Sequence, residues 1–173
     1  MTGLQPALGA GFGCGTIVGM DSALRPRRSV LFMPGANARA LEKARSIDCD
    51  GIIIDLEDAV APDLKVEARE RTAGVVRGHP YGYREVAIRV NGMDTQWYHD
   101  DLVAAVAAGP DAIAVPKVSS AEQVRAIVAD MEAAGADKSV KLWAMIETPR
   151  AVLDCLDIAE ASDRLTVLIM GTN

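Results

Sequence analysis

The residues with the clearest chemical potential are three carboxylates in four positions, Asp55, Glu57 and Asp58, which directly follow the apolar run 51–54. That run is short and rich in isoleucine, so it predicts a buried strand rather than a helix. Carboxylates this close repel one another unless a cation or an arginine lies nearby. We therefore favour a catalytic or binding role over the alternatives, a solvated loop or acidic residues in the first turn of a helix.

Four further apolar segments also end in polar residues, glycine or proline. The polar residues at these ends are Arg89, Asn91, Lys117, Glu147 and Asn173. Arginine suits bidentate binding of an anionic oxygen, and glutamate is a typical ligand of Mg²⁺. Structural roles are also open: Arg89 can pair with Asp55 or Glu57. Glu147 can instead cap a helix, and Lys117 fits an ion-pair partner better than a Schiff-base lysine.

The elements that must position these residues alternate between strand and helix from Arg25 onward. Strands are expected within residues 29–33, 51–54, 85–90, 112–117, 142–147 and 167–173. Helix starts are expected at Asn37, Asp63, Thr95, Ser120 and Thr148, with Gly78, Gly109 and Gly135 ending three of the helices. Strands that are apolar on both faces indicate a parallel sheet covered by helices, either open and doubly wound or closed into a barrel. In both, the site lies at the C-terminal strand ends, so the polar residues should converge.

Composition favours a small-molecule partner. The chain of 173 residues has room for one domain, and its net charge of −6 argues against a nucleic-acid-binding surface. Its three cysteines lack the spacing of a zinc site or a disulfide framework and fit a reducing cytosol. No apolar run is long enough to span a bilayer. Residues 1–24, rich in glycine and alanine, are expected to be a flexible tail that precedes a domain at 25–173.

Five motifs, taken in order, resemble the family of the citrate lyase β-subunit, malyl-CoA lyase and HpcH/HpaI aldolases. They are Arg28-Ser29-Val30-Leu31-Phe32-Met33-Pro34-Gly35, Asp55-Leu56-Glu57-Asp58-Ala59-Val60 with Lys65, Arg89-Val90-Asn91-Gly92, Pro116-Lys117 and Ile146-Glu147-Thr148-Pro149. The resemblance extends from Arg25 to Asn173. It implies a (β/α)8 TIM barrel, of which this chain holds about the first six β-α units. It also implies an Mg²⁺-dependent enzyme that forms homo-oligomers. The expected location, from the cysteine usage, is cytoplasmic.

The resemblance assigns roles to individual residues. Glu147 is expected to be a metal ligand, and Arg89 is expected to bind the carboxylate and carbonyl region of the substrate. Glu57 and Asp58 are expected to act in catalysis around the metal and its waters. The further substrate-binding residues are expected to be Arg28, Pro34, Gly35, Asn91 and Lys117.

A basic cluster precedes the first expected strand and consists of Arg25, Arg27 and Arg28. Given the resemblance, it is expected either to contact the phosphates of coenzyme A, with Arg28 near the coenzyme, or to be a solubilising group of charges. The sequence leaves these two interpretations equally open.

The chain departs from the family after the sixth strand. The family pattern continues as Gly-Thr-Asn-Asp, in which the last Asp is the second metal ligand, whereas this chain stops at Asn173. A barrel of eight units usually takes about 250 residues. We therefore expect a fragment or a truncated form that lacks about two β-α units, the lid and that ligand.

The expected function is that of a carbon-carbon lyase. It would cleave or form a 3-hydroxy-acyl-CoA of the citryl-, malyl- or citramalyl-CoA type through a metal-stabilised enolate. Its partner would be an acyl-CoA or a small carboxylic acid, with no nucleic acid and no membrane. Two alternatives stay open. A metal-dependent aldolase on free 2-oxo acids would not require coenzyme A thioesters, and a truncated, non-catalytic binding subunit would not bind Mg²⁺.

Overall fold

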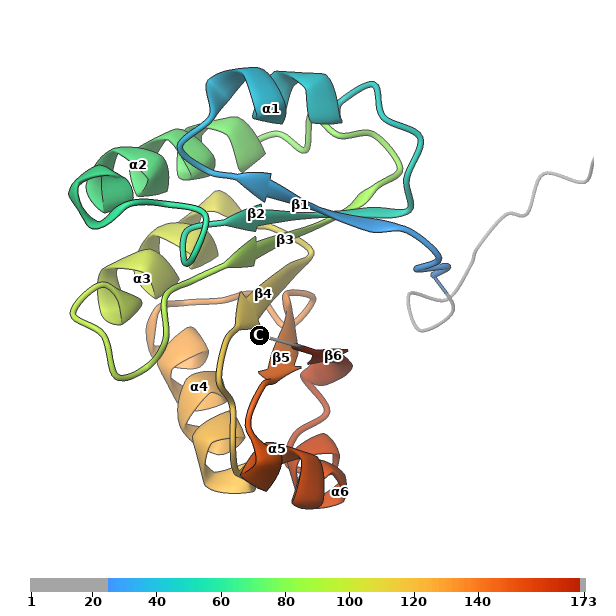
Figure 1. Ribbon diagram of the computed structural model, residues 1–173, viewed down its shortest axis with the longest axis vertical. Coiled ribbons are helices and arrows are strands. Elements are labelled where there is room, and N and C mark those ends of the chain that lie inside the picture. Colours follow the sequence, from blue (N-terminus) through green and yellow to red (C-terminus); the bar gives the residue numbers. More distant parts are fainter. Residues whose placement is uncertain (1–24, 172–173) are drawn as a thin grey trace, which may run out of the picture.

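The computed structural model describes residues 25–171, which form a curved sheet of six parallel strands with helices along its outer side (Figure 1). The strands are β1 (Val30–Pro34), β2 (Gly51–Asp55), β3 (Glu85–Arg89), β4 (Ala112–Val115), β5 (Lys141–Ile146) and β6 (Leu165–Met170). Each strand lies beside the next one in the chain. The predicted α/β architecture of parallel strands is therefore confirmed. The expected tail at 1–24 and Asn173 lie outside the described residues.

Helices or short helical turns connect the strands. They are α1 (Ala38–Ala44), the 3-10 turn η2 (Pro62–Leu64), α2 (Lys65–Val76), α3 (Tyr98–Ala108), α4 (Ala121–Ala133), α5 (Pro149–Leu153) and α6 (Cys155–Ala159). Three predicted caps are confirmed: the side chains of Asn37, Ser120 and Thr148 each accept a bond from the backbone N–H three residues later. These bonds satisfy amides that the first turn leaves without partners. In the described part of the chain, no helix is both long and apolar enough to cross a bilayer.

Two predicted helix starts are wrong. Helix α3 begins at Tyr98 rather than at Thr95, because the Thr95 hydroxyl donates to the carbonyl of Gly92 at 2.8 Å and closes a turn before the helix. Asp63 lies in the 3-10 turn η2, so α2 begins two residues later than expected. The first error arises because short polar side chains such as threonine also stabilise turns. In the second case the turn η2, which begins at Pro62 and has no side-chain cap hydrogen bond, comes before α2.

Side chains alternate between the two faces of the sheet, as strand geometry requires. One face packs against the helices and holds the main core, for example Ile52, Ile54, Ile88 and Ile113. The inner face carries a second cluster, in which Trp143 lies among smaller residues such as Ala114. Asp55 and Arg89 come two residues after Ile53 and Ala87 of this inner cluster, so their side chains lie on the same inner face, near the strand ends.

Close backbone packing joins β1 to β2 at Gly35. The Gly35 N–H donates to the carbonyl of Asp55 at 2.9 Å. A Cβ atom at this position would lie 2.7 Å from the Thr72 hydroxyl and 2.9 Å from both the Asp55 carbonyl and the Leu56 side chain. Glycine is required here because no side chain fits between the end of β1 and the turn after β2.

We expect alanine substitutions at two glycines to have opposite effects on stability. Gly35→Ala should lower the free energy of unfolding by about 1–3 kcal/mol, because the added methyl group overlaps backbone that cannot move away. Gly74→Ala is the matched control: this glycine is exposed inside α2, and apart from its own stretch of helix no atom lies within 4 Å of the added Cβ, so it should stabilise by about 0.5–1 kcal/mol. Urea denaturation of both variants tests this, and equal effects would contradict the close approach at Gly35.

Candidate active site at the carboxyl ends of the strands

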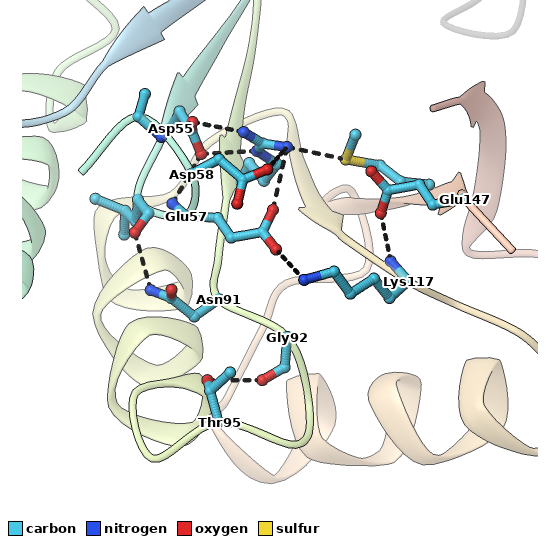
Figure 2. Close-up of polar contacts among 12 residues, drawn as sticks. Asp55, Glu57, Asp58, Asn91, Gly92, Thr95, Lys117 and Glu147 are labelled. Atoms are coloured by element: carbon cyan, nitrogen blue, oxygen red, sulfur yellow. Dashed lines mark hydrogen bonds and ion pairs between the residues drawn. The ribbon is translucent and has the colours of Figure 1, made fainter. Parts of the chain in front are cut away.

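Five charged side chains from the carboxyl ends of four strands gather at one end of the sheet; Figure 2 labels all of them except Arg89. They are Asp55 at the end of β2, Glu57 in the turn that follows, Arg89 at the end of β3, Lys117 after β4 and Glu147 after β5. Asp55 and Arg89 are register partners of adjacent strands and so lie side by side. Parallel strands bring their carboxyl ends to one edge, which is the basis of the predicted convergence.

A buried ion pair between Arg89 and Asp55 forms the base of the site. Arg89 donates from Nε and Nη2 to the two carboxylate oxygens of Asp55, at 2.7 and 2.6 Å. The same oxygens accept the backbone N–H groups of Glu57 and Ala59, at 2.8 and 2.9 Å. Asp55 therefore fixes both the guanidinium group and the turn, so it is a positioning carboxylate rather than a free one.

Glu57 is buried, at 6% exposure, although it carries a charge. Its Oε2 lies 3.1 Å from Arg89 Nη1, and its Oε1 lies 3.1 Å from Lys117 Nζ. Oε2 nevertheless makes no hydrogen bond within the described residues. Burial raises the pKa of Glu57, although the hydrogen bond from Lys117 and the charge of Arg89 oppose this shift. The carboxylate is therefore a stronger base than an ordinary glutamate.

The backbone of Lys117 contacts the side chain of Glu147. Lys117 takes a left-handed conformation, with φ of 57°, that is uncommon for residues other than glycine. Its N–H donates to Glu147 Oε2 at 2.7 Å, while its ammonium group reaches Glu57. A side chain at Gly171 would collide with Glu147, because a Cβ there would lie 2.3 Å from Glu147 Cγ. The strand ends thus leave room for this carboxylate and aim it at the cluster.

The donor set fits a hard divalent cation. Mg²⁺ takes oxygen ligands and usually binds one or two protein carboxylates together with water. Glu147 lies in the space left by Gly171, and Glu57 Oε2 is buried without a hydrogen-bond partner among the described residues. Four carboxylates, those of Asp55, Glu57, Asp58 and Glu147, lie around the cations Arg89 and Lys117, and Lys65 adds a third positive charge beside the turn. The cluster therefore has excess negative charge. Within residues 25–171, no group of three or more His, Cys, Asp or Glu side chains lies close enough together to hold a metal ion as the structure stands.

Of the other predicted site residues, Asp58 lies next to the cluster and Arg28 lies far from it. Asp58 lies at the rim, with its carboxylate 3.9 Å from Arg89 Nη1 and largely exposed. Arg28 is not near the cluster: it precedes β1 and pairs with Asp50, before β2, at the opposite end of the sheet. That pairing lowers the pKa of Asp50 to about 2. Contact of Arg28 with coenzyme A stays an untested prediction.

Three predicted substrate-binding residues make contacts within the protein in this structure. Asn91 is buried, and its side-chain oxygen and nitrogen both already have partners, Lys65 and the Leu56 carbonyl among them. Pro34 and Gly35 form the end of β1 against Asp55. None of these contacts offers a free polar side chain to a substrate. In this structure these residues support the site, and their contact with a substrate stays a prediction.

Sequence reasoning gave no role to two residues that the structure ties to the site. Asp101 is fully buried and accepts bonds from Arg69 and Asn91. A signal was available, because Asp101 shares a helix face with the buried Tyr98 and Leu102, where a carboxylate needs a partner. Met145 is the second, with its sulfur 3.8 Å from Arg89 Nη1. Its signal was its alternation with Trp143 on the inner face.

The sequence of this chain is similar to those of several enzymes that act on acyl-CoA or citrate, by their names. A (3S)-malyl-CoA thioesterase of Cereibacter sphaeroides is 49% identical over 154 residues, which are 89% of this chain and 52% of the relative. A citrate lyase subunit beta of Escherichia coli is 36% identical over 152 residues, which are 85% of this chain and 50% of that protein. The chain thus spans about half the length of the curated relatives it matches.

Solved structures agree with the sequence relatives. The citrate lyase beta subunit of M. tuberculosis, complexed with oxaloacetate and magnesium, matches with a TM-score of 0.66 and 28% identity, over 82% of this chain and 56% of that one. The family model described as HpcH/HpaI aldolase/citrate lyase matches residues 28–173, which is most of the chain. The fold, the order of the strand-end motifs and these matches agree. The chain belongs to the HpcH/HpaI aldolase/citrate lyase family.

Proposed function

We propose that the natural protein is a magnesium-dependent enzyme that cleaves the coenzyme A thioester of a small 3-hydroxy acid of the malyl type. The observation that carries the proposal is the buried Arg89, which Asp55 holds at the strand ends. Beside it lies the Glu57 carboxylate, whose Oε2 makes no hydrogen bond within the described residues. Relatives named for malyl-CoA hydrolysis and for citrate lyase support the substrate class.

The residues of the chain would divide the work between binding and proton transfer. Glu147, with Asp58 or Glu57 through water, would hold the metal, which supplies Lewis-acid polarisation of the thioester carbonyl oxygen when bound. Burial lowers the pKa of Arg89, but the hydrogen bond and charge of Asp55, together with the charges of Glu57 and Asp58, outweigh burial and leave that pKa raised. Arg89 therefore stays charged and would stabilise the oxygen on which negative charge develops.

Hydrolysis of the thioester is the reaction that we place first, because the thioesterase relative is 49% identical. In this reaction a water oxygen forms a bond to the thioester carbonyl carbon, and the carbon–sulfur bond breaks. Glu57, whose pKa is raised by burial, would take the proton from the water. The proton ends on the sulfur of the leaving coenzyme A.

Carbon-carbon cleavage is the second candidate, favoured by the match to citrate lyase at 36% identity. Here the base removes the proton of the 3-hydroxyl group, and the bond between the α-carbon and the carbinol carbon breaks. The products are a carbonyl compound and the enolate of an acyl-CoA, which then takes up a proton. The same arginine would stabilise the enolate oxygen, so the residues present serve either reaction.

Product analysis separates the two reactions. We expect the natural protein with Mg²⁺ to convert malyl-CoA into malate and free coenzyme A, seen by liquid chromatography, and removal of the metal with EDTA to abolish turnover. Acetyl-CoA and glyoxylate would instead support the lyase. Turnover of free 2-oxo acids without a thioester would support an aldolase. Turnover of none of these, together with no Mg²⁺ binding, would support a non-catalytic subunit.

Replacing one carboxylate tests the metal assignment. Glu147→Gln keeps the shape of the side chain but removes its charge, so the Mg²⁺ concentration for half-maximal activity should rise about 10-fold or more. Glu70→Gln, at an exposed position of α2, is the matched control and should leave the Mg²⁺ requirement unchanged. An unchanged requirement in Glu147→Gln would remove Glu147 from the proposed metal site.

A conservative exchange tests the role of Arg89. Arg89→Lys keeps a positive charge for the buried Asp55 but loses the planar fork that holds two carboxylate oxygens. We expect turnover to fall about 100- to 1,000-fold, with far-ultraviolet circular dichroism retained. Turnover within about tenfold of the wild type would show that Arg89 only pairs with Asp55.

A further inference from the structure

A buried lysine lies directly beneath the acidic turn. Lys65, the first residue of α2, is 5% exposed, and its ammonium group has three acceptors. They are the carbonyl oxygens of Leu56 and Glu57, at 2.8 and 2.7 Å, and Asn91 Oδ1, at 2.7 Å. A lysine ammonium group has three donors, so all of them are used. Such complete pairing is what makes a buried lysine tolerable.

Two of the three acceptors lie on either side of one residue of the proposed site, Glu57. The Leu56 carbonyl belongs to the peptide unit before Glu57, and the Glu57 carbonyl belongs to the unit after it. Fixing both units leaves the backbone at Glu57 little freedom, so the direction of its Cα–Cβ bond is set. Lys65 thus acts on the placement of Glu57 without contacting its carboxylate.

Asn91 links the lysine to two helices. Its amide nitrogen donates to the Leu56 carbonyl at 2.9 Å, and its backbone N–H donates to Asp101 Oδ2 at 3.1 Å. The other oxygen of Asp101 accepts from Arg69 Nε at 2.6 Å. Arg69 lies on α2 and Asp101 on α3, so the network joins the turn to the part of the fold outside the sheet.

We infer that Lys65 is a positioning residue, which holds the turn 56–60 so that the Glu57 carboxylate stands between Arg89 and Lys117. The inference rests on the proposed function for its effect on catalysis, but its structural part stands independently of the reaction. Lys65 also lies 5.3 Å from the ring of Trp97, which covers the ammonium group. Burial lowers the pKa of Lys65, and the negative charges of Asp55 and Asp101 oppose this shift.

Hydrogen exchange in the natural protein tests the structural part. Lys65→Met keeps the length of the side chain but removes all three donors. We expect amides in peptides from the turn 56–60 to exchange at least about 10-fold faster, because the carbonyls that fix it lose their partner. A peptide from β4 should exchange as in the wild type. Lys43→Met, an exposed lysine on α1, is the matched control and should change neither peptide.

The kinetic part uses the split between kcat and KM. If the natural protein turns over a thioester, kcat of Lys65→Met should fall about 100-fold while KM stays within about threefold, because a misplaced base slows the reaction but leaves the substrate contacts. A protein without turnover would overturn the proposed function, and the exchange experiment would still decide the role of Lys65. Unchanged exchange in the turn, or a rise of KM with kcat retained, would overturn the inference.

A milder variant covers the case in which Lys65→Met does not fold. Lys65→Gln keeps an amide group that can donate to one or two of the three acceptors. We expect faster exchange of the turn than in the wild type. Equal exchange in Lys65→Gln and the wild type would contradict a positioning role.

Discussion

The fork between Arg89 and Asp55 is the interaction on which the site depends. It joins two adjacent strands at their carboxyl ends, and the two residues are 7% (Arg89) and 1% (Asp55) exposed. The Asp55 carboxylate also organises the turn that carries Glu57. Buried ion pairs are costly unless their remaining donors and acceptors are also satisfied. Here the backbone N–H groups of Glu57 and Ala59 complete the set. The pair therefore fixes a cation and a turn at once.

Two further contacts complete the geometry around that fork. Gly35 allows β1 to lie close against Asp55 and Leu56, and Gly171 leaves space for Glu147. Charges of both signs then face one another across the strand ends, with carboxylates in excess. Glu57 is buried with a raised pKa, and one of its oxygens makes no hydrogen bond within the described residues, as suits a base or part of a cation site.

Much of this arrangement could be predicted from the sequence, because strand periodicity and charge at strand ends are local signals. They placed Asp55, Glu57, Arg89, Lys117 and Glu147 at one edge, and the pairing of Arg89 with Asp55 was among the stated alternatives. The start of α3 could not be read locally, since threonine serves turns as well as caps. The placement of Asn91, and the position of Arg28 at the far end of the sheet, depend on tertiary partners, Asp101 and Asp50, that spacing does not reveal.

We propose that the carboxylates at the ends of β2 and β5 hold a divalent cation in the natural protein. Anomalous diffraction from crystals soaked in Mn²⁺, which prefers the same oxygen ligands as Mg²⁺, tests it directly. We expect one strong peak within about 2.5 Å of a Glu147 carboxylate oxygen, on the side that faces Glu57. A peak elsewhere, or no peak at these strand ends at saturating Mn²⁺, would show that these carboxylates do not form the cation site.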